Sequence, residues 1–167
     1  MKSPALKKIG NVAALKAMRD QVCSGKPNRA DGAQRQILIC FGGSCLASGA
    51  KEVRDALRDA LAQEGLADEV ALVETGCMGP CVIGPVIMVG EDRTFYQGVK
   101  PEDAAEIVAT HLRDGRRVER LLVTDSSGAT PAPCRDDLDF FKRQTQVVLR
   151  NCGWINPEKI QEYFGRD

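Results

Sequence analysis

The residues best suited to chemistry in this sequence are two pairs of cysteines. Four residues separate Cys40 from Cys45, three separate Cys77 from Cys81, and thirty-one lie between the pairs. Thiolates are preferred ligands for zinc and for iron–sulfur clusters, so four converging thiols would make a tetrathiolate metal site. The Cys-x-x-Cys spacing of dithiol redox enzymes does not occur in the sequence, which disfavours that chemistry.

The segments around these cysteines predict a sheet with both pairs at one edge. An apolar run over 37–41 and a second one over 70–75 predict buried strands, and the apolar stripe of 50–63 predicts a helix between them. A strand–helix–strand crossover makes the two strands parallel, and adjacent strands lie about 4.8 Å apart. Both pairs are therefore expected at the C-terminal edge of the sheet, where open α/β sheets place ligands.

The rest of the central region predicts a hairpin and a second helix. Residues 85–89 and 94–99 are expected to form antiparallel strands across a short turn, and Pro101 is expected to open a helix. The order over residues 36–122 is then β-α-β-β-β-α, which predicts an α/β fold of the thioredoxin-like type.

The flanking regions are predicted as appendages to this domain. Residues 1–35 are interpreted as an N-terminal helix and linker, 123–135 as a second linker and 136–167 as a helical tail. Within the tail we expect a helix over 138–150, with Phe141, Val147 and Val148 facing inward, and another beginning with Asn156 as its N-cap. Five of the eight aromatic residues follow residue 139, so we expect the tail to pack against another surface.

Composition limits the classes of partner and compartment. Twenty-three basic residues balance twenty-three acidic ones, whereas nucleic-acid binders usually carry a basic excess. No apolar run approaches the roughly 18 residues that span a bilayer, so neither nucleic acid nor membrane insertion is expected. Seven cysteines, an odd number, with no export signal indicate a reducing compartment, and we expect the cytoplasm.

The spacing of the cysteines favours an iron–sulfur cluster over zinc. Structural zinc is held by paired cysteines too, but usually with tighter two-residue gaps. A [2Fe–2S] cluster takes four cysteines, and burying its negative charge requires backbone N–H groups close to the sulfurs. A structural zinc or thiolate module that serves the assembly of a complex remains the alternative. Four glycines in the two loops are expected to allow that close approach: Gly42, Gly43, Gly76 and Gly79.

Other conspicuous residues are predicted to lie outside the chemistry. Cys23, Cys134 and Cys152 are expected away from the site as buried or surface thiols. His111 is expected on the solvent side of its helix or as a partner of the helix dipole. Met78 is expected to cover the cluster by packing rather than to ligate it.

Cys40-x4-Cys45 and Cys77-x3-Cys81, with the run ETGCMGPC at 74–81, resemble the thioredoxin-like [2Fe–2S] ferredoxins. The small iron–sulfur subunit of respiratory complex I is one member, and the resemblance covers residues 36–115. It implies that the four cysteines bind a [2Fe–2S] cluster. It also implies that the domain transfers single electrons and has no catalytic residue of its own.

The tail, with VLRNCG at 148–153 and NPE at 156–158, resembles the opening of the FMN- and NADH-binding subunit of complex I. It also resembles the corresponding subunits of NAD(P)-linked hydrogenases and formate dehydrogenases. This resemblance implies an electron relay or store near a flavin, at the start of a longer polypeptide. FMN, NAD(P)H and 4Fe–4S sites would lie in the missing C-terminal part. The expected partners are the other subunits of an oxidoreductase complex, with a homodimer of the fragment as a further possibility.

Overall fold

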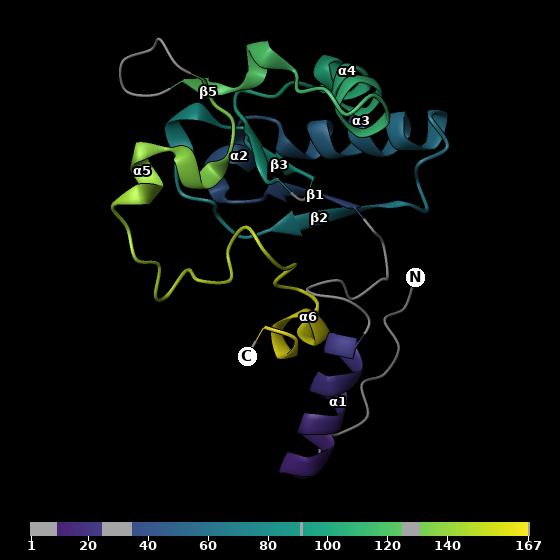
Figure 1. Cartoon of the computed structure of the whole chain (residues 1–167), viewed down its shortest axis with the longest axis vertical. Coiled ribbons are helices and arrows are strands. Elements are labelled where there is room, and N and C mark those ends of the chain that lie inside the picture. The colour runs from purple at the N-terminus through teal and green to yellow at the C-terminus, as the bar shows by residue number, and fades with distance from the viewer. Residues whose placement is uncertain (1–9, 25–34, 91, 125–130, 167) are drawn as a thin grey trace.

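A mixed sheet with two helices on one face forms the centre of the molecule in the computed structural model (Figure 1). The structure describes residues 10–24, 35–90, 92–124 and 131–166. The strand order is β2-β1-β3-β4; β1 and β2 run parallel, while β3 is antiparallel to both of its neighbours. The parallel pair and the antiparallel hairpin of β3 and β4 are as the sequence predicts, whereas the antiparallel pairing of β3 with β1 was not predicted. The strands are β1 (Arg35–Cys40), β2 (Val70–Thr75), β3 (Ile87–Val89) and β4 (Thr94–Tyr96).

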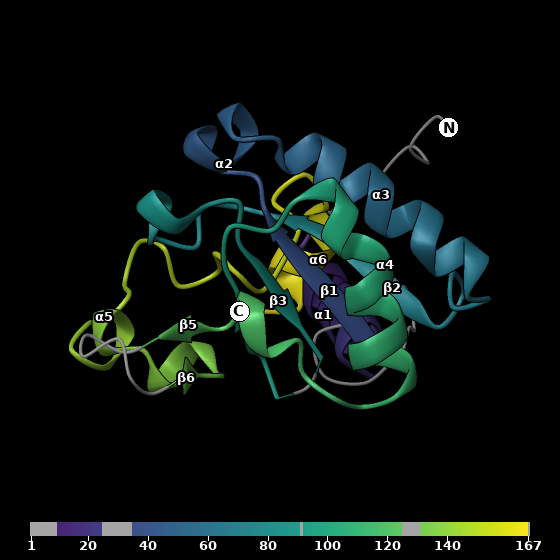
Figure 2. The ribbon, with the colours of Figure 1, turned by 90° about the horizontal axis from the view of Figure 1, so that it is seen from above.

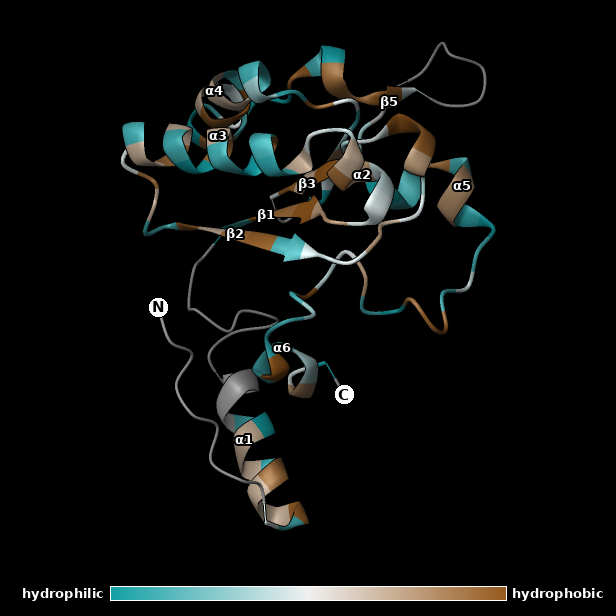
Figure 3. Cartoon of the chain, turned by 180° about the vertical axis from the view of Figure 1, so that it is seen from behind, coloured by the Kyte–Doolittle hydropathy of each residue, from teal (hydrophilic) through white to brown (hydrophobic). Residues whose placement is uncertain are grey.

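Burial on both faces explains why the strands carry continuous apolar runs. Ile37 and Ile39 of β1 and Ile87 of β3 are fully buried, as expected for strands covered on both sides. The hydrophobic strands stand out in Figure 3. Helix α3 (Ala50–Gln63) has the predicted bounds, and its apolar stripe is buried.

The second helical segment covers the same face of the sheet as α3 (Figure 2). It is continuous but changes its winding: a 3₁₀ turn, η2 (Pro101–Asp103), leads into α4 (Ala104–Glu106) and a π-helical stretch, η3 (Ile107–Arg113). Pro101 opens it as predicted, because the first turn of a helix needs no N–H from that residue. The η3 residues Ile107 and Val108 are fully buried.

Two local predictions differ from the structure. The Gly-Gly-Ser segment after β1, expected to be a loop, forms a short helix, α2 (Gly43–Ala47). The hairpin strands are shorter than the predicted 85–89 and 94–99. Pro85 has no N–H for a strand ladder, although its carbonyl still accepts a hydrogen bond from Val99 at 3.1 Å.

Part of the predicted second linker is tied to the sheet. A two-stranded pair, β5 (Val123–Thr124) and β6 (Pro131–Ala132), closes this segment after the turn η4 (Glu119–Leu121). Isolated bridges join it to β4 through Thr94–Cys134 and Tyr96–Leu122. The division of the chain into domains stays a prediction.

The helix predicted over 138–150 is wrong. After the turn η5 (Arg135–Asp137), only α5 (Asp139–Lys142) is helical, and Phe141 alone of the predicted inward residues is buried. Val147 and Val148 are 74% and 92% exposed. The apolar residues 147–149 are consecutive, so on a helix they would point in different directions and could not form one buried face.

The last helix, α6 (Ile160–Phe164), begins later than predicted. Asn156 does not cap it. Its side-chain oxygen instead accepts a hydrogen bond from the N–H of Glu158 at 2.9 Å, which holds a local turn ahead of the helix.

The tail crosses the sheet face that α3 and α4 leave uncovered (Figure 1). The N–H of Gly153 donates a hydrogen bond to the hydroxyl of Thr75 at 2.9 Å, and a side chain on Gly153 would meet Met78 and Met88. The predicted packing of the tail is thus against the chain's own sheet. Helix α1 (Val12–Ser24) packs against α6, while residues 1–9, the 25–34 segment and the side chain of Cys23 lie outside the described part.

Candidate metal centre

The C-terminal ends of β1 and β2 bring the four predicted cysteines together. Cys40 ends β1, Cys45 lies in α2, Cys77 follows β2, and Cys81 opens the single turn η1 (Cys81–Ile83). The sulfurs of Cys77 and Cys81 are 3.7 Å apart. The Cys40 thiol interacts electrostatically with those of Cys45 and Cys81, so both loops contribute to one site.

The donor set fits the cluster that the sequence predicts. With metal–sulfur bonds of about 2.3 Å, two thiolates on one tetrahedral metal lie about 3.8 Å apart. The separation of 3.7 Å between Cys77 and Cys81 matches that value, and Cys40 and Cys45 form a second interacting pair. Two pairs of thiols are what a [2Fe–2S] cluster requires. Among the described residues, no group of three or more Cys, His, Asp or Glu side chains is arranged so that it could hold a single metal ion.

Burial divides the site into a closed side and an open one. Cys40 and Cys45 are 2% and 1% exposed, Cys77 is half-buried, and Cys81 is exposed. Burial raises the pKa of Cys40 to about 11, so metal ligation there must displace a proton.

Two backbone groups support negative charge on the buried sulfur. The N–H of Met78 points at the Cys40 sulfur at 3.5 Å, and the N–H of Gly42 donates to it as well. Backbone N–H groups directed at sulfur stabilise the thiolate form and tune the potential of a bound cluster. Met78 is 1% exposed, which fits its predicted packing role.

Two glycines keep the loops close together because there is no room for a side chain. A Cβ on Gly42 would lie 3.0 Å from the Cβ of Cys77, and one on Gly84 would lie 2.9 Å from the Cys45 sulfur. Gly84 was not among the predicted glycines, and only its position three residues after Cys81 hinted at it. The expectation for Gly43 is wrong, since nothing lies within 4 Å of its missing side chain.

Comparison with known proteins agrees with this geometry. The family described as "Thioredoxin-like [2Fe-2S] ferredoxin" matches residues 26–112 of the chain. The chain belongs to this family. Membership supports a [2Fe–2S] cluster as the cofactor and confirms the predicted fold class.

Individual relatives extend the comparison. A 2Fe-2S ferredoxin of Aquifex aeolicus is 41% identical over 90 residues, which cover 53% of this chain and 79% of the relative. The subunit HndB of an NADP-reducing hydrogenase from Solidesulfovibrio fructosivorans is 27% identical over 111 residues, covering 65% and 86%. A solved thioredoxin-like [2Fe-2S] ferredoxin from Aquifex aeolicus aligns at a TM-score of 0.52 with 35% identity, over 55% of this chain and 92% of that one. No helix in the described ranges has both the length and the apolar character needed to cross a membrane.

The tail adds contacts to the second cysteine loop of this ferredoxin domain. The sulfur of Cys152 lies 2.9 Å from where a Cβ on Gly76 would be, within electrostatic reach of Cys77 and Cys40. The prediction that Cys152 lies away from the site is therefore wrong, because chain spacing carries no information about where the tail returns.

Gly79 and Cys134 are two further residues for which the sequence made predictions. Gly79, at a φ of +117°, has the ring of Phe140 3.0 Å from its missing side chain, so the tail contacts the second loop at Gly79 as well as at Gly76. Cys134, by contrast, lies away from the site as predicted. It pairs with Thr94 at the other end of the sheet.

His111 is half-buried rather than on the solvent side, and its lowered pKa does not fit the other prediction, a charged partner of the helix dipole. Its Nδ1 lies 2.9 Å from the hydroxyl of Tyr96, which also accepts a hydrogen bond from the N–H of Val118 at 3.0 Å. The hydroxyl proton therefore points to Nδ1. Burial lowers the pKa of His111 and raises the pKa of Tyr96 to about 12, so both stay neutral and serve packing.

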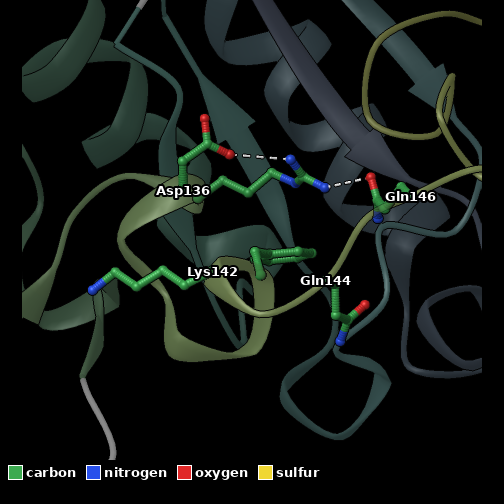
Figure 4. A pocket seen from close by; sticks show the side chains of 6 residues that line it. Asp136, Lys142, Gln144 and Gln146 are labelled. Atoms are coloured by element: carbon green, nitrogen blue, oxygen red, sulfur yellow. Dashed lines mark hydrogen bonds and ion pairs between the residues drawn. The ribbon is translucent and has the colours of Figure 1, made fainter.

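A hollow of about 280 Å³ beside α5 carries polar side chains, but its charge is already paired (Figure 4). Arg135 donates hydrogen bonds to Asp136 at 3.1 Å and Gln146 at 2.6 Å, and it stacks on Phe141 at 4.1 Å. Lys142 points away from this group in the figure. These contacts anchor the tail and give no sign of a second reactive site.

Proposed function

We propose that the chain is a one-electron carrier whose [2Fe–2S] cluster is held by Cys40, Cys45, Cys77 and Cys81. The observation behind this proposal is the meeting of two thiol pairs at the ends of two parallel strands, with 3.7 Å between the sulfurs of Cys77 and Cys81. When bound, the cluster supplies uptake and release of single electrons, with no substrate bond made or broken.

The chain's own groups set the conditions for that chemistry. The N–H groups of Met78 and Gly42 stabilise charge on the sulfur of Cys40. The absent side chains of Gly42 and Gly84 let the two loops approach each other, and burial keeps water from the first pair. Low dielectric and oriented N–H groups are the means by which a protein tunes such a site.

We further propose that this carrier belongs to a cytoplasmic multi-subunit NAD(P)H-linked oxidoreductase and relays or stores electrons near a flavin. A relative that is named as a subunit of an NADP-reducing hydrogenase supports this placement. So does the tail, because the segment resembling the opening of a flavin-binding subunit lies directly against Gly76 and Gly79 of the second cysteine loop.

Anaerobic reconstitution of the chain with iron and sulfide tests the carrier proposal. We expect two irons and two sulfides per chain, and a paramagnetic resonance signal that appears only after reduction by dithionite. Cys134→Ser, at the far end of the sheet, is the matched control and should load like the parent chain. One zinc per chain with no sulfide would instead establish the structural thiolate module.

The assembled complex, purified with its other subunits, tests the placement near a flavin. NADPH or NADH should reduce the cluster of this chain within the complex but leave the isolated loaded chain oxidised, because a nicotinamide gives up two electrons as a hydride and the cluster takes up one. A cluster that stays oxidised in the complex while the flavin is reduced would contradict the placement and leave the carrier proposal intact.

A further inference from the structure

Cys81, the most exposed of the four thiols, forms an open edge of the candidate site. Cys81 is exposed, and the next residue, Val82, is 95% exposed on the single turn η1. Cys40 and Cys45, on the other side of the site, are almost fully buried. Val82 thus adds an exposed apolar side chain directly beside an exposed thiol.

The tail packs against the second cysteine loop next to Cys77. Cys152 sits against Gly76, and the hydrogen bond from Gly153 to Thr75 fixes the tail there.

The two cysteine loops that form the open edge carry no charged residue. Residues 36–50 and 75–90 contain no Asp, Glu, Lys, Arg or His. Among the flanking charges, Glu74 pairs with Arg54 at 2.8 Å, so the two cancel. Because these loops offer a partner no charge to pair with, we expect recognition at this edge to rely on apolar contact.

We propose that electrons enter and leave through the edge formed by Cys81 and Val82, and that the redox protein docking there presents an uncharged, apolar surface. This inference rests on the carrier function proposed above. The transfer moves one electron, with no proton and no bond change, between the site and the partner's redox centre.

A second apolar surface provides the competing route. A hollow of about 360 Å³ has Gly76 and Cys152 in its lining together with the exposed side chains of Val148, Ile160 and Tyr163. It reaches the second loop from the tail side. The experiment therefore compares the two surfaces directly.

Three variants place the same charge at different surfaces: Val82→Asp at the open edge, Val148→Asp at the hollow, and Val12→Asp on α1. The replaced valines are 95%, 92% and 69% exposed, so none of the substitutions disturbs a core. Each loaded, reduced chain is mixed in stopped flow with an anionic oxidant, cobalt(III)–EDTA, or a cationic one, tris(phenanthroline)cobalt(III). Each cobalt(III) ion accepts one electron to become cobalt(II).

Val82→Asp should slow oxidation by the anion about threefold at low salt and accelerate oxidation by the cation by at least as much. Both effects should fade at high ionic strength. Val148→Asp and Val12→Asp should leave the ratio of the two rates within about twofold of the parent chain. A larger change in Val148→Asp than in Val82→Asp, or equal ratios in all three, would overturn the inference.

Iron and sulfide are measured before every run, so a chain that holds no cluster is recognised as a failure of the carrier proposal itself. A second readout needs no cluster. In the cluster-free, folded chain, iodoacetamide should alkylate Cys81 faster than Cys40 or Cys45, as read by peptide mass spectrometry. Equal rates with the circular dichroism of the folded sheet intact would show that the open edge is not there. If the sheet is lost, the kinetic comparison decides.

The apolar character of the partner has its own test in the assembled complex. Val82→Asp and Val82→Lys should both slow reduction of the chain's cluster by NADPH, because either charge must be desolvated on docking. Acceleration by one of the two signs would show a charged partner surface and refute this half of the inference.

Discussion

The two ends of the four-stranded sheet satisfy their polar groups in opposite ways. At the thiol end, where β1 and β2 finish, four cysteines and two backbone N–H groups face one another in loops without charge. At the hairpin end, where β3 turns into β4, Asp92 accepts hydrogen bonds from Thr94 at 2.8 Å and from Arg117 at 2.6 Å. These contacts hold the pKa of Asp92 below its usual value although burial alone would raise it.

This difference indicates that the thiol end serves the proposed metal site and that the hairpin end serves the stability of the fold. The polar groups of the hairpin end find their partners within the protein, as buried and half-buried polar groups usually do, except for two guanidinium nitrogens of Arg93, whose guanidinium instead stacks on the Trp154 ring at 3.6 Å. The thiol end is not complete within the protein, because burial keeps Cys40 protonated until a metal replaces the proton. We therefore expect changes at the thiol end to alter metal content and changes at the hairpin end to alter stability alone.

The largest effect is expected from the buried thiols. Cys45→Ser should lose nearly all iron, because it removes a ligand and leaves a hydroxyl at a site that is 1% exposed. An unpaired buried polar group costs about 1–3 kcal/mol in addition to the lost ligand. Cys81→Ser should retain more iron, since its hydroxyl stays in water. Iron and sulfide per chain and the Tm measure both. If Cys134→Ser at the hairpin end loses as much iron as Cys45→Ser, the distinction between the ends fails.

The next effect concerns the space between the two cysteine loops. Gly42→Ala should destabilise the chain by about 1–3 kcal/mol and lower its iron content, because the new methyl group would lie 3.0 Å from the Cβ of Cys77. The neighbouring substitution Gly43→Ala is the control. It meets no atom within 4 Å and should leave both quantities unchanged or slightly improved. Urea unfolding and iron analysis distinguish them, and equal losses would argue against close loop packing.

A smaller effect should follow from detaching the tail from the thiol end. Thr75→Val leaves the buried N–H of Gly153 without its acceptor, at a cost of about 1–3 kcal/mol. The tail should then be cut faster by protease, while Thr75→Ser keeps the hydroxyl and the protection. Because the four thiols are untouched, iron content should stay near that of the parent chain. Unchanged protease resistance in Thr75→Val would mean that other contacts hold the tail.

The thiol end was largely predictable from sequence, and the tail was not. A strand–helix–strand crossover with a clear apolar stripe over 50–63 forces the ends of β1 and β2 together, so the four cysteines had one place to meet. The tail has no such period. Its conformation is set by the sheet face and by pairs such as Arg135 with Gln146, which exist only after folding. Cys152 therefore gave no sequence signal, because its neighbour Gly76 becomes close only through the tail's path.

The smallest expected effect belongs to the hairpin end and isolates one proton. His111 is the single histidine of the chain, and burial lowers its pKa below the ordinary 6.5. Below pH 6.5 the imidazole of His111 binds a proton in the unfolded chain but stays neutral in the folded chain. The free energy of unfolding therefore falls as the pH drops toward the lowered pKa. Between pH 7.5 and 5.5 this loss is at most about 1.4 kcal/mol. His111→Asn keeps an acceptor for the Tyr96 hydroxyl without a titrating group, so its free energy of unfolding should depend less on pH over that range. Its iron content should match the parent chain. A variant that keeps the parent's pH slope but loses iron would place His111 in the function of the thiol end and erase the contrast between the two ends.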